Sequence, residues 1–272
     1  MTSRAARTRP SPIVLKIGGS VLTGPKAYAR TAKWLQQSCD GPLGLGAPVL
    51  VVVSAENGVT DRLLADAQAI CPSPDTRALD LLWSTGELRS AALLALHLQA
   101  RGVPARALNV HEAGLRAGDA ALGARTECLT RALEAHAVVI VPGFLATEAG
   151  GAIVSLGRGG SDLSAVTLAA AVGADRCELV KDVPGYFTSD PAISADATHI
   201  PFIDFEAALA MAASGCDLVQ AAALDAARAL GVRLVIRTTD AAGRRTLVAS
   251  SPEGESHAFR HEDHSRRAAI GA

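Results

Sequence analysis

Hydrophobic residues in this chain gather in short continuous runs, separated by longer stretches in which apolar and polar residues alternate with helical spacing. Each run is rich in valine or isoleucine, which is typical of strands that are covered on both faces of a sheet. The runs are IVLKIGG at 13–19, VLVVVSA at 49–55, AVVIVPGF at 137–144, CELVKDV at 177–183 and VRLVIR at 232–237.

The helical spacing predicts helices between these runs. The expected helices cover 26–38, 61–70, 77–101, 120–135, 161–173 and 204–230, the last broken near Gly215. Because strands and helices alternate along the chain, the pattern predicts an α/β fold in which a mostly parallel sheet lies between helical layers.

We expect one domain over residues 13–249. A soft boundary near Gly150 and Gly151 divides it into an N-terminal lobe, about 13–150, and a C-terminal lobe, about 151–249. Residues 1–12 hold arginines without an apolar segment behind them and are expected to form a disordered tail. Residues 250–272 form a charged tail, whose histidines at 257, 261 and 264 lack a supporting carboxylate or cysteine cluster, so no metal site is predicted.

Charge and composition narrow the classes of function. The 272 residues are 49% hydrophobic and carry a net charge of −1, so neither a nucleic acid nor an anionic membrane is an expected partner. No apolar run reaches the roughly 20 residues that cross a bilayer. The five cysteines form no CxxC pair, which favours a reducing cytoplasm over a disulfide framework or a zinc site. Small-molecule chemistry is therefore the first expectation.

Lysine is rare and its positions are informative. It occurs only at 16, 26, 33 and 181, among 26 basic residues. Lys16 and Lys181 both lie at the ends of strand-like apolar runs, where a buried ammonium is costly unless it is paired or binds an anion.

Two glycine-containing turns follow predicted strands and could hold an anion. Gly18, Gly19 and Ser20 follow the first run, where glycines let backbone N–H groups approach a ligand; a tight strand exit is the plain alternative. The stretch LGRGGSD offers a second cradle: glycines 157, 159 and 160 form a nest, Ser161 caps the next helix and Arg158 supplies a bidentate fork. A capped helix after a glycine turn would explain Ser161 but not Arg158.

Other phosphate signatures and polar motifs carry less weight. The chain has neither GxxxxGK[ST] nor a GxGxxG after its first strand, so the P-loop and dinucleotide-binding classes lose support. Ser84 and Glu87 in STGE match a helix capping box, and on spacing alone that is the favoured role. After Ser54 at a strand end, either Thr60 or Asp61 is an ordinary N-cap.

Taken in order, these motifs resemble the aspartokinases of the amino acid kinase family. The matching stretches, from about 13 to 239, are VLKIGGS, VVVSAENGVTDRLL, STGELRSAALLALHL, PGF, LGRGGSDLSA, CELVKDVPGYFTSDP and VRLVIRTT. The resemblance implies a three-layer αβα sandwich whose N-terminal lobe holds the acceptor and whose C-terminal lobe holds ATP with Mg²⁺.

The resemblance also implies roles for individual residues. Lys16, Gly18, Gly19 and Asp162 would form the catalytic group, with Lys16 on the transferring phosphoryl group. Glu87 would bind the substrate ammonium and Arg158 its carboxylate. The remaining implied substrate-binding residues are Ser20, Ser54, Gly159, Gly160 and Ser161, and the implied nucleotide-binding residues are Lys181, Asp182, Gly185, Tyr186, Phe187 and Asp190.

The sequence departs from the aspartokinase pattern in the nucleotide half. Lys181 stands where aspartokinases usually have the threonine of TDV, Ala192 stands where they have the arginine of DPR, and Asp217 stands where they have the lysine of KVLHP. Lys181 either restores the lost positive charge from another strand or forms a structural ion pair.

The leading hypothesis is ATP-dependent phosphorylation of a small amino acid carboxylate, aspartate first among the candidates, to an acyl phosphate. The alternatives are a non-catalytic kinase-like binding module with an eroded ATP site, and a kinase for a phosphate or phosphonate acceptor. The resemblance implies a homodimer. The chain ends where the regulatory ACT region of aspartokinases would begin, so feedback inhibition of that kind is not expected.

Overall fold

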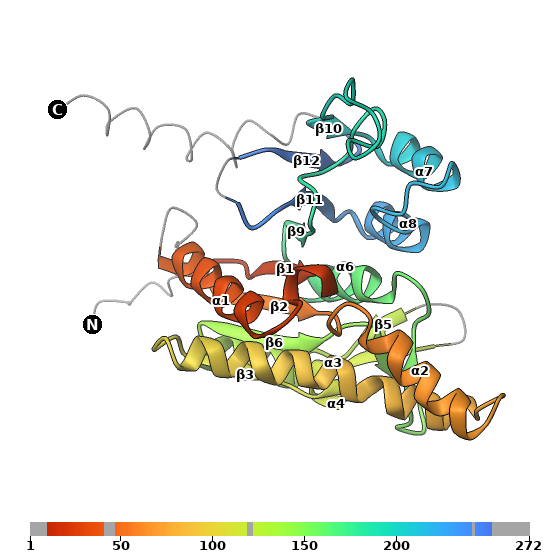
Figure 1. Ribbon diagram of the computed structural model, residues 1–272. Coiled ribbons are helices and arrows are strands. Elements are labelled where there is room, and N and C mark those ends of the chain that lie inside the picture. Colours follow the sequence, from red (N-terminus) through yellow and green to blue (C-terminus); the bar gives the residue numbers. More distant parts are fainter. Residues whose placement is uncertain (1–9, 41–46, 119–121, 241–242, 252–272) are drawn as a thin grey trace, which may run out of the picture.

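A central sheet of eight strands organises the molecule (Figure 1). The computed structural model describes residues 10–40, 47–118, 122–240 and 243–251. All described strand pairs in this sheet are parallel except β11 with β12, which are antiparallel. In spatial order the strands are β10 (Phe202–Ile203), β12 (Arg245–Val248), β11 (Arg233–Arg237), β9 (Arg176–Val180), β1 (Ile13–Ile17), β2 (Val49–Val53), β6 (Val138–Pro142) and β3 (Ala105–Ala107).

Helices cover the two faces of this sheet. On one face, α1 (Pro25–Asp40) and α3 (Thr76–Gln99) pack their apolar residues against alternate strand positions such as Val51 and Ile140. The intervening strand positions, such as Val52 and Val139, face the opposite layer. That layer contains α5 (Glu127–Ala135), α6 (Gly160–Ala171), α7 (Phe205–Ala213) and α8 (Ala221–Leu230). The strands are thus buried on both sides, which explains their continuous apolar sequence.

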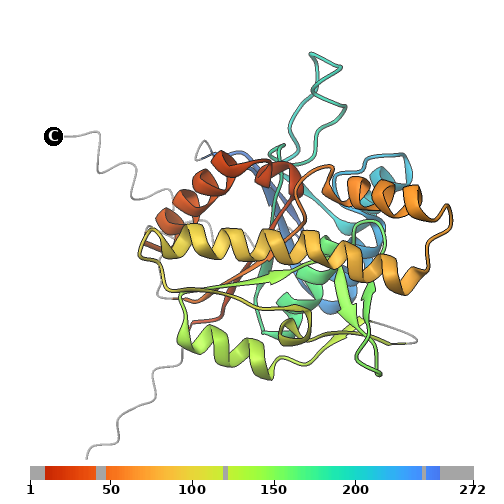
Figure 2. The same cartoon turned by 60° about the horizontal axis from the view of Figure 1, so that its bottom comes forward.

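A smaller sheet of four strands lies beside the main one (Figure 1). Its order is β5 (Leu122–Ala124), β4 (Leu115–Ala117), β7 (Leu145–Thr147) and β8 (Ile153–Ser155). The remaining elements are the 3₁₀ helix η1 (Gly19–Leu22), α2 (Val59–Ile70) and the short α4 (Val110–Ala113). In Figure 2, α3 runs across the sheet, and the segment between β9 and β10 projects from the body of the molecule.

The predicted fold class is confirmed, and the five predicted strand runs each contain a strand. One helix was predicted too long: residues 122–124 form β5, and α5 begins only at Glu127. The predicted break near Gly215 is present, since α7 ends at Ala213 and α8 begins at Ala221. Of the two predicted tails, residues 1–9 and 252–272 lie outside the described residues, and so do the three tail histidines.

Candidate active site

Lys16 and Asp162, which are buried, and the partly buried Lys181 form the charged centre of the site. The Nζ of Lys16 lies 2.8 Å from Oδ1 of Asp162, and the Nζ of Lys181 lies 2.7 Å from Oδ2 of the same carboxylate. Lys16 belongs to β1, Lys181 directly follows β9, and Asp162 stands in the first turn of α6. Because β1 and β9 are adjacent and parallel, both lysines lie on the face of the sheet that α6 covers.

Electrostatics makes this centre positive. Burial acts to raise the pKa of Asp162, but the ammonium groups of Lys16 and then Lys181 outweigh it and hold the pKa below its ordinary value. Burial, together with the neighbouring charge of Lys16, lowers the pKa of Lys181 despite the opposing effect of Asp162. Two ammonium groups therefore share one carboxylate at the positive end of a helix, an arrangement that attracts an anionic ligand.

A cavity of about 500 Å³ opens beside these charges. It brings together eight of the residues predicted to act in catalysis or substrate binding: Lys16, Ser54, Glu87, Arg158, Gly159, Gly160, Ser161 and Asp162. Lys181 lines it as well. Gly157, from the predicted glycine nest, lines it too, and the lining residues that the sequence did not predict as part of the site are Ala55, Asn57, Thr60, Phe144, Asp217 and Gln220.

The predicted turn after β1 borders this cavity but does not line it. A Cβ added to Gly18 would lie 3.8 Å from the Nζ of Lys16 and 3.8 Å from the Oγ of Ser20. A Cβ on Gly19 would lie 2.3 Å from the carbonyl oxygen of Ala55, so only glycine fits there. The close packing of the turn against the loop after β2 therefore explains Gly19 without a ligand.

Glu87 is a buried carboxyl group in the wall of the cavity. It lies within α3 with 4% of its surface exposed, and its Oε2 has no hydrogen-bond partner among the described residues. Burial raises the pKa of Glu87 to about 8, although a backbone hydrogen bond with Ala55 and the charge of Lys16 both act to lower it. A buried acceptor atom without a donor fits a site for a ligand cation.

Arg158 is exposed at the rim of the same cavity and forms no ion pair with a described residue. It lies between Gly157 and Gly159, whose φ angles of 73° and 77° are in the left-handed region. A Cβ on Gly159 would lie 2.4 Å from the Cγ of Gln220, so this turn also packs too closely for a side chain. The guanidinium is thus presented on a fixed backbone with no protein carboxylate to bind.

Three predicted helix caps are wrong. Ser84 and Glu87 lie in the middle of α3, which begins at Thr76 with Asp75 as its N-cap. The hydroxyl of Ser84 donates to the carbonyl of Leu81. The N-cap of α2 is Gly58, not Thr60 or Asp61, and that of α6 is Gly159, not Ser161. In both helices a left-handed glycine makes the entry turn, so no side-chain cap is used.

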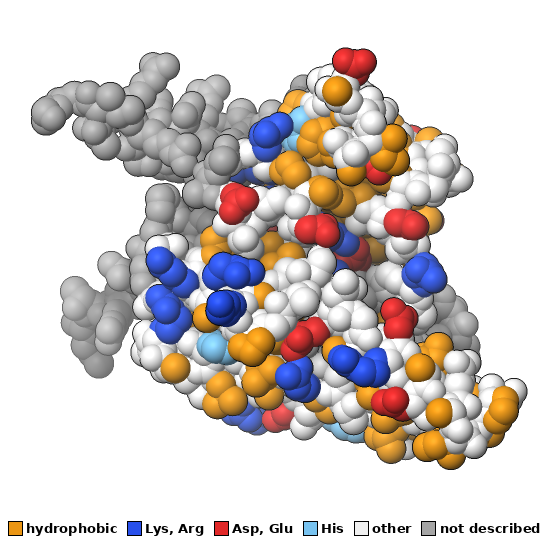
Figure 3. All heavy atoms as spheres, viewed as in Figure 1, with side chains coloured by type: hydrophobic (Ala, Val, Ile, Leu, Met, Phe, Trp, Pro, Cys, Tyr) orange, Lys and Arg blue, Asp and Glu red, His pale blue; other side chains and the backbone are white. Residues whose placement is uncertain are grey.

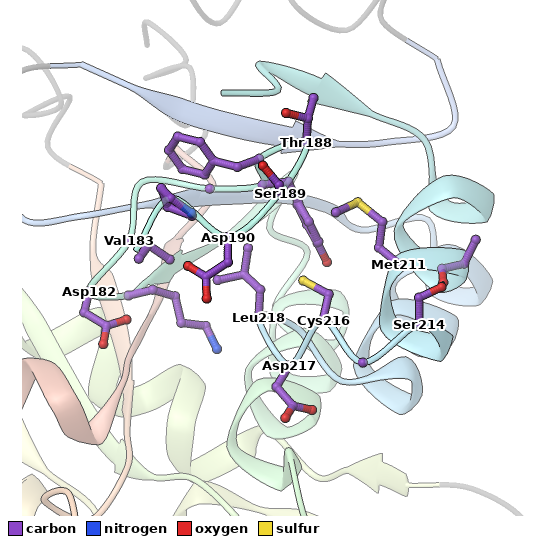
Figure 4. Close-up of a pocket in the computed structure, with 17 residues that line it drawn as sticks. Asp182, Val183, Thr188, Ser189, Asp190, Met211, Ser214, Cys216, Asp217 and Leu218 are labelled. Carbon is purple, nitrogen blue, oxygen red and sulfur yellow. The ribbon is translucent and has the colours of Figure 1, made fainter. Parts of the chain in front are cut away.

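A second cavity, of about 870 Å³, adjoins the first (Figure 4). It is lined by all six residues predicted to bind the nucleotide: Lys181, Asp182, Gly185, Tyr186, Phe187 and Asp190. Its opposite wall comes from α7 and the loop before α8, which supply Met211, Cys216 and Leu218. Lys181 and Asp217 line both cavities, so the two spaces meet at this pair. Figure 3 shows a hollow in this region of the surface, with basic and acidic side chains on its floor.

The donor atoms in the second cavity fit Mg²⁺. Asp182, Asp190 and Asp217 supply carboxylate oxygens, the ligands that this cation prefers. Within the described residues no three His, Cys, Asp or Glu side chains are grouped closely enough to hold a metal by themselves. A cation here would therefore need phosphate oxygens to complete its coordination.

Comparisons with known proteins establish the family of this chain. The model of the amino acid kinase family matches residues 11–238, and the chain belongs to that family. An aspartokinase from Thermus thermophilus is 40% identical over 208 residues, which cover 75% of this chain and 51% of that protein. The aspartate kinase Ask_LysC of Stutzerimonas stutzeri is 36% identical over 246 residues, covering 89% of this chain and 59% of that protein.

The crystal structure of aspartate kinase from Synechocystis superposes with a TM-score of 0.80 at 34% identity, covering 89% of this chain and 40% of that one. The chain thus spans about half the length of the curated relatives it matches. Among the described residues, no helix is both long and apolar enough to cross a membrane.

Proposed function

We propose that this protein transfers the γ-phosphoryl group of ATP to a carboxylate of a small amino acid, with aspartate as the first candidate. The observation that carries the proposal is the group of ion pairs in which Lys16 and Lys181 both contact Asp162. Lys181 lines both the smaller cavity and the larger one, so this charged group lies where the two cavities meet. The similarity to aspartokinases supports the choice of aspartate.

The acceptor occupies the smaller cavity in this proposal. Its ammonium group binds the carboxylate of Glu87, whose Oε2 has no described donor, and its α-carboxylate binds the guanidinium of Arg158. Ser54 and the backbone of Gly159 and Gly160 complete the wall around it. These contacts leave the side-chain carboxylate of the acceptor free to point toward Lys16.

The chemical step needs alignment and charge neutralisation rather than a general base. An oxygen of the acceptor carboxylate attacks the γ-phosphorus, the bond from that phosphorus to the β,γ-bridging oxygen breaks, and ADP leaves with the bonding electrons. Lys16 and Lys181 neutralise charge on the transferring group, and Asp162 holds both ammonium groups in place. When bound, Mg²⁺ adds Lewis-acid neutralisation of the phosphate oxygens.

A second candidate is a non-catalytic module that binds an amino acid. One observation favours it: the described lining of the larger cavity holds a single cation, Lys181, against three carboxylates. A phosphate or phosphonate acceptor is less well supported, because Glu87 would then have no ammonium to bind. The homodimer remains a prediction from the family resemblance.

The discriminating experiment is an acceptor panel. The purified protein is incubated with ATP, Mg²⁺, hydroxylamine and each candidate amino acid, and hydroxamate and ADP are measured. Hydroxamate formation with aspartate supports the proposed reaction. Absence of both products with every candidate, combined with calorimetric binding of an amino acid but not of ATP, supports the non-catalytic module.

A further inference from the structure

The larger cavity has an unusual charge for a space that would receive a polyphosphate. Its described lining contains the carboxylates of Asp182, Asp190 and Asp217 and only one cation. That cation, Lys181, already donates to Asp162 at 2.7 Å. A nucleotide entering without a counterion would therefore meet a predominantly negative wall.

The same wall contains a buried hydroxyl group, that of Tyr186, which has no hydrogen-bond acceptor among the described residues. The side chain of Tyr186 is 1% exposed and lines the cavity, yet its hydroxyl has no hydrogen-bond partner among the described residues. Buried hydroxyl groups are normally paired, so a free one in a cavity wall is explained by a ligand that supplies the acceptor.

Asp217 lies where a bound cation could offset the repulsion between the carboxylates of the cavity and a polyphosphate. It lies between α7 and α8, lines both cavities and forms no ion pair with a described residue. The Nε2 of Gln220, the N-cap residue of α8, donates to its Oδ1 at 3.1 Å and leaves Oδ2 available. In Figure 4 the carboxylates of Asp190 and Asp217 come from separate loops and lie along the same cavity. A carboxylate fixed beside phosphate oxygens is stabilised by a shared divalent cation.

We propose that Asp217 is a ligand of the divalent cation that enters this cavity with the nucleotide, so that nucleotide affinity depends on the metal through this residue. The inference rests on the proposed function only in taking the larger cavity as the nucleotide site. It does not depend on the acceptor or on turnover. The inference gives a role to Asp217, which replaces the lysine of the aspartokinase pattern. A lysine would supply positive charge directly, whereas Asp217 would supply it by binding a metal cation.

Calorimetric titration of ADP into the full chain tests this, with excess Mg²⁺ and again with EDTA. The wild-type protein should bind ADP with Mg²⁺ and lose about 30-fold or more of that affinity with EDTA. Asp217→Asn should weaken binding about 10-fold with Mg²⁺ and change it little with EDTA. Asp217→Lys should bind ADP more tightly than the wild type with EDTA and lose the response to Mg²⁺.

A direct readout and a matched control complete the test. With Mn²⁺ in place of Mg²⁺, electron paramagnetic resonance should detect protein-bound Mn²⁺ in the presence of ADP for the wild type, and much less for Asp217→Asn. Asp196→Asn, on the exposed segment before β10, should behave as the wild type. Circular dichroism melting establishes that each variant is folded.

The outcomes separate the two proposals. ADP binding whose dependence on Mg²⁺ is the same in the wild type and in Asp217→Asn would overturn the role of Asp217 and leave the nucleotide site intact. Failure of folded wild-type protein to bind ADP under either condition would overturn the nucleotide site itself, and the metal role with it.

Discussion

Lys16 and Lys181 bind the two oxygens of a single carboxylate, that of Asp162, from two adjacent parallel strands. The register pairs Lys16 with Leu179, so Lys181, which directly follows β9, lies two residues beyond this pairing on the same face of the sheet. The sheet therefore fixes the separation of the two ammonium groups, and Asp162 fixes their direction. This rigidity is what a phosphoryl-transfer site needs, because its electrostatic groups must be in place before the reaction.

Replacing Lys181 by methionine should impair turnover more than acceptor binding. Methionine keeps much of the side-chain volume but removes the charge that we propose neutralises the transferring phosphoryl group, so we expect kcat to fall about 10²- to 10³-fold with a small change in acceptor KM. Steady-state kinetics measures both. Lys26→Met, at an exposed position in α1, is the control and should retain wild-type rates. If kcat is unchanged in Lys181→Met, the ion pair between Lys181 and Asp162 is purely structural.

Replacing Arg158 by alanine should weaken acceptor binding alone. Arg158 is exposed and pairs with no described carboxylate, so its removal should leave folding intact and raise the acceptor KM about 10-fold or more. Nucleotide affinity, measured by calorimetry, should be unchanged. The opposite result, loss of nucleotide binding with acceptor binding preserved, would contradict the proposed arrangement of the two cavities. Arg131→Ala on α5 serves as a control for the loss of a surface arginine.

Acceptor affinity should rise with pH through the titration of Glu87. Burial raises the pKa of this group to about 8, so at pH 7 most of the free protein holds it protonated, whereas the proposed acceptor ammonium would bind its carboxylate form. The Kd for the acceptor should decrease from pH 6.5 to 8.5, and binding at pH 7 should release close to one proton, as calorimetry in buffers of different ionisation enthalpy would measure. Glu87→Gln should remove the proton release; proton release that persists in this variant would point to another group.

The same group should make stability depend on pH. The folded-state pKa of Glu87 is raised from the ordinary 4.5 to about 8. Between these two pH values the native protein keeps a proton on Glu87 that the unfolded chain has already released. Stability from this group is present below pH 4.5 and is lost as pH rises across that window. Compared with the wild type, Glu87→Gln should therefore gain Tm as the pH is raised from 5 to 8.5. A constant difference in Tm over this range would show that the carboxyl group does not titrate there.

Much of the fold could be predicted because its central strands carry a strong signal. Continuous Val- and Ile-rich runs mark the five strands in the middle of the main sheet, since burial on both faces leaves few polar positions. The edge strands and the small sheet gave no such signal, because strands of two to four residues such as Phe202–Ile203 and Leu122–Ala124 are too short for a period to be read. Their pairing is decided by tertiary contacts.

Site residues could be predicted where they lie at the ends of apolar strands. They could not be predicted where a loop distant in the sequence packs against the cavity. Lys16 and Lys181 could be singled out because a lysine in an apolar run needs an anionic partner. That partner, Asp162, was named through the family resemblance and not from spacing. Asp217 and Gln220 reach the cavity through the packing of the loop before α8, which no local pattern encodes. STGE was misjudged because its spacing matches a capping box although the stretch lies inside α3, whose N-cap is Asp75.

Replacing Tyr186 by phenylalanine should stabilise the free protein and weaken its binding of nucleotide. The hydroxyl is buried without a described partner, so its removal should raise the free energy of unfolding by about 1 kcal/mol in the absence of ligand. If the nucleotide supplies the acceptor for this hydroxyl, ADP affinity should fall about 5- to 10-fold. Tyr28→Phe is the matched contrast, because the hydroxyl of Tyr28 donates to Ser90 at 3.0 Å: it should lower stability and leave ADP affinity unchanged. Thermal melts and calorimetry measure both quantities. A Tyr186→Phe variant that is destabilised, with wild-type ADP affinity, would mean that this hydroxyl has a partner within the protein and does not contact the nucleotide.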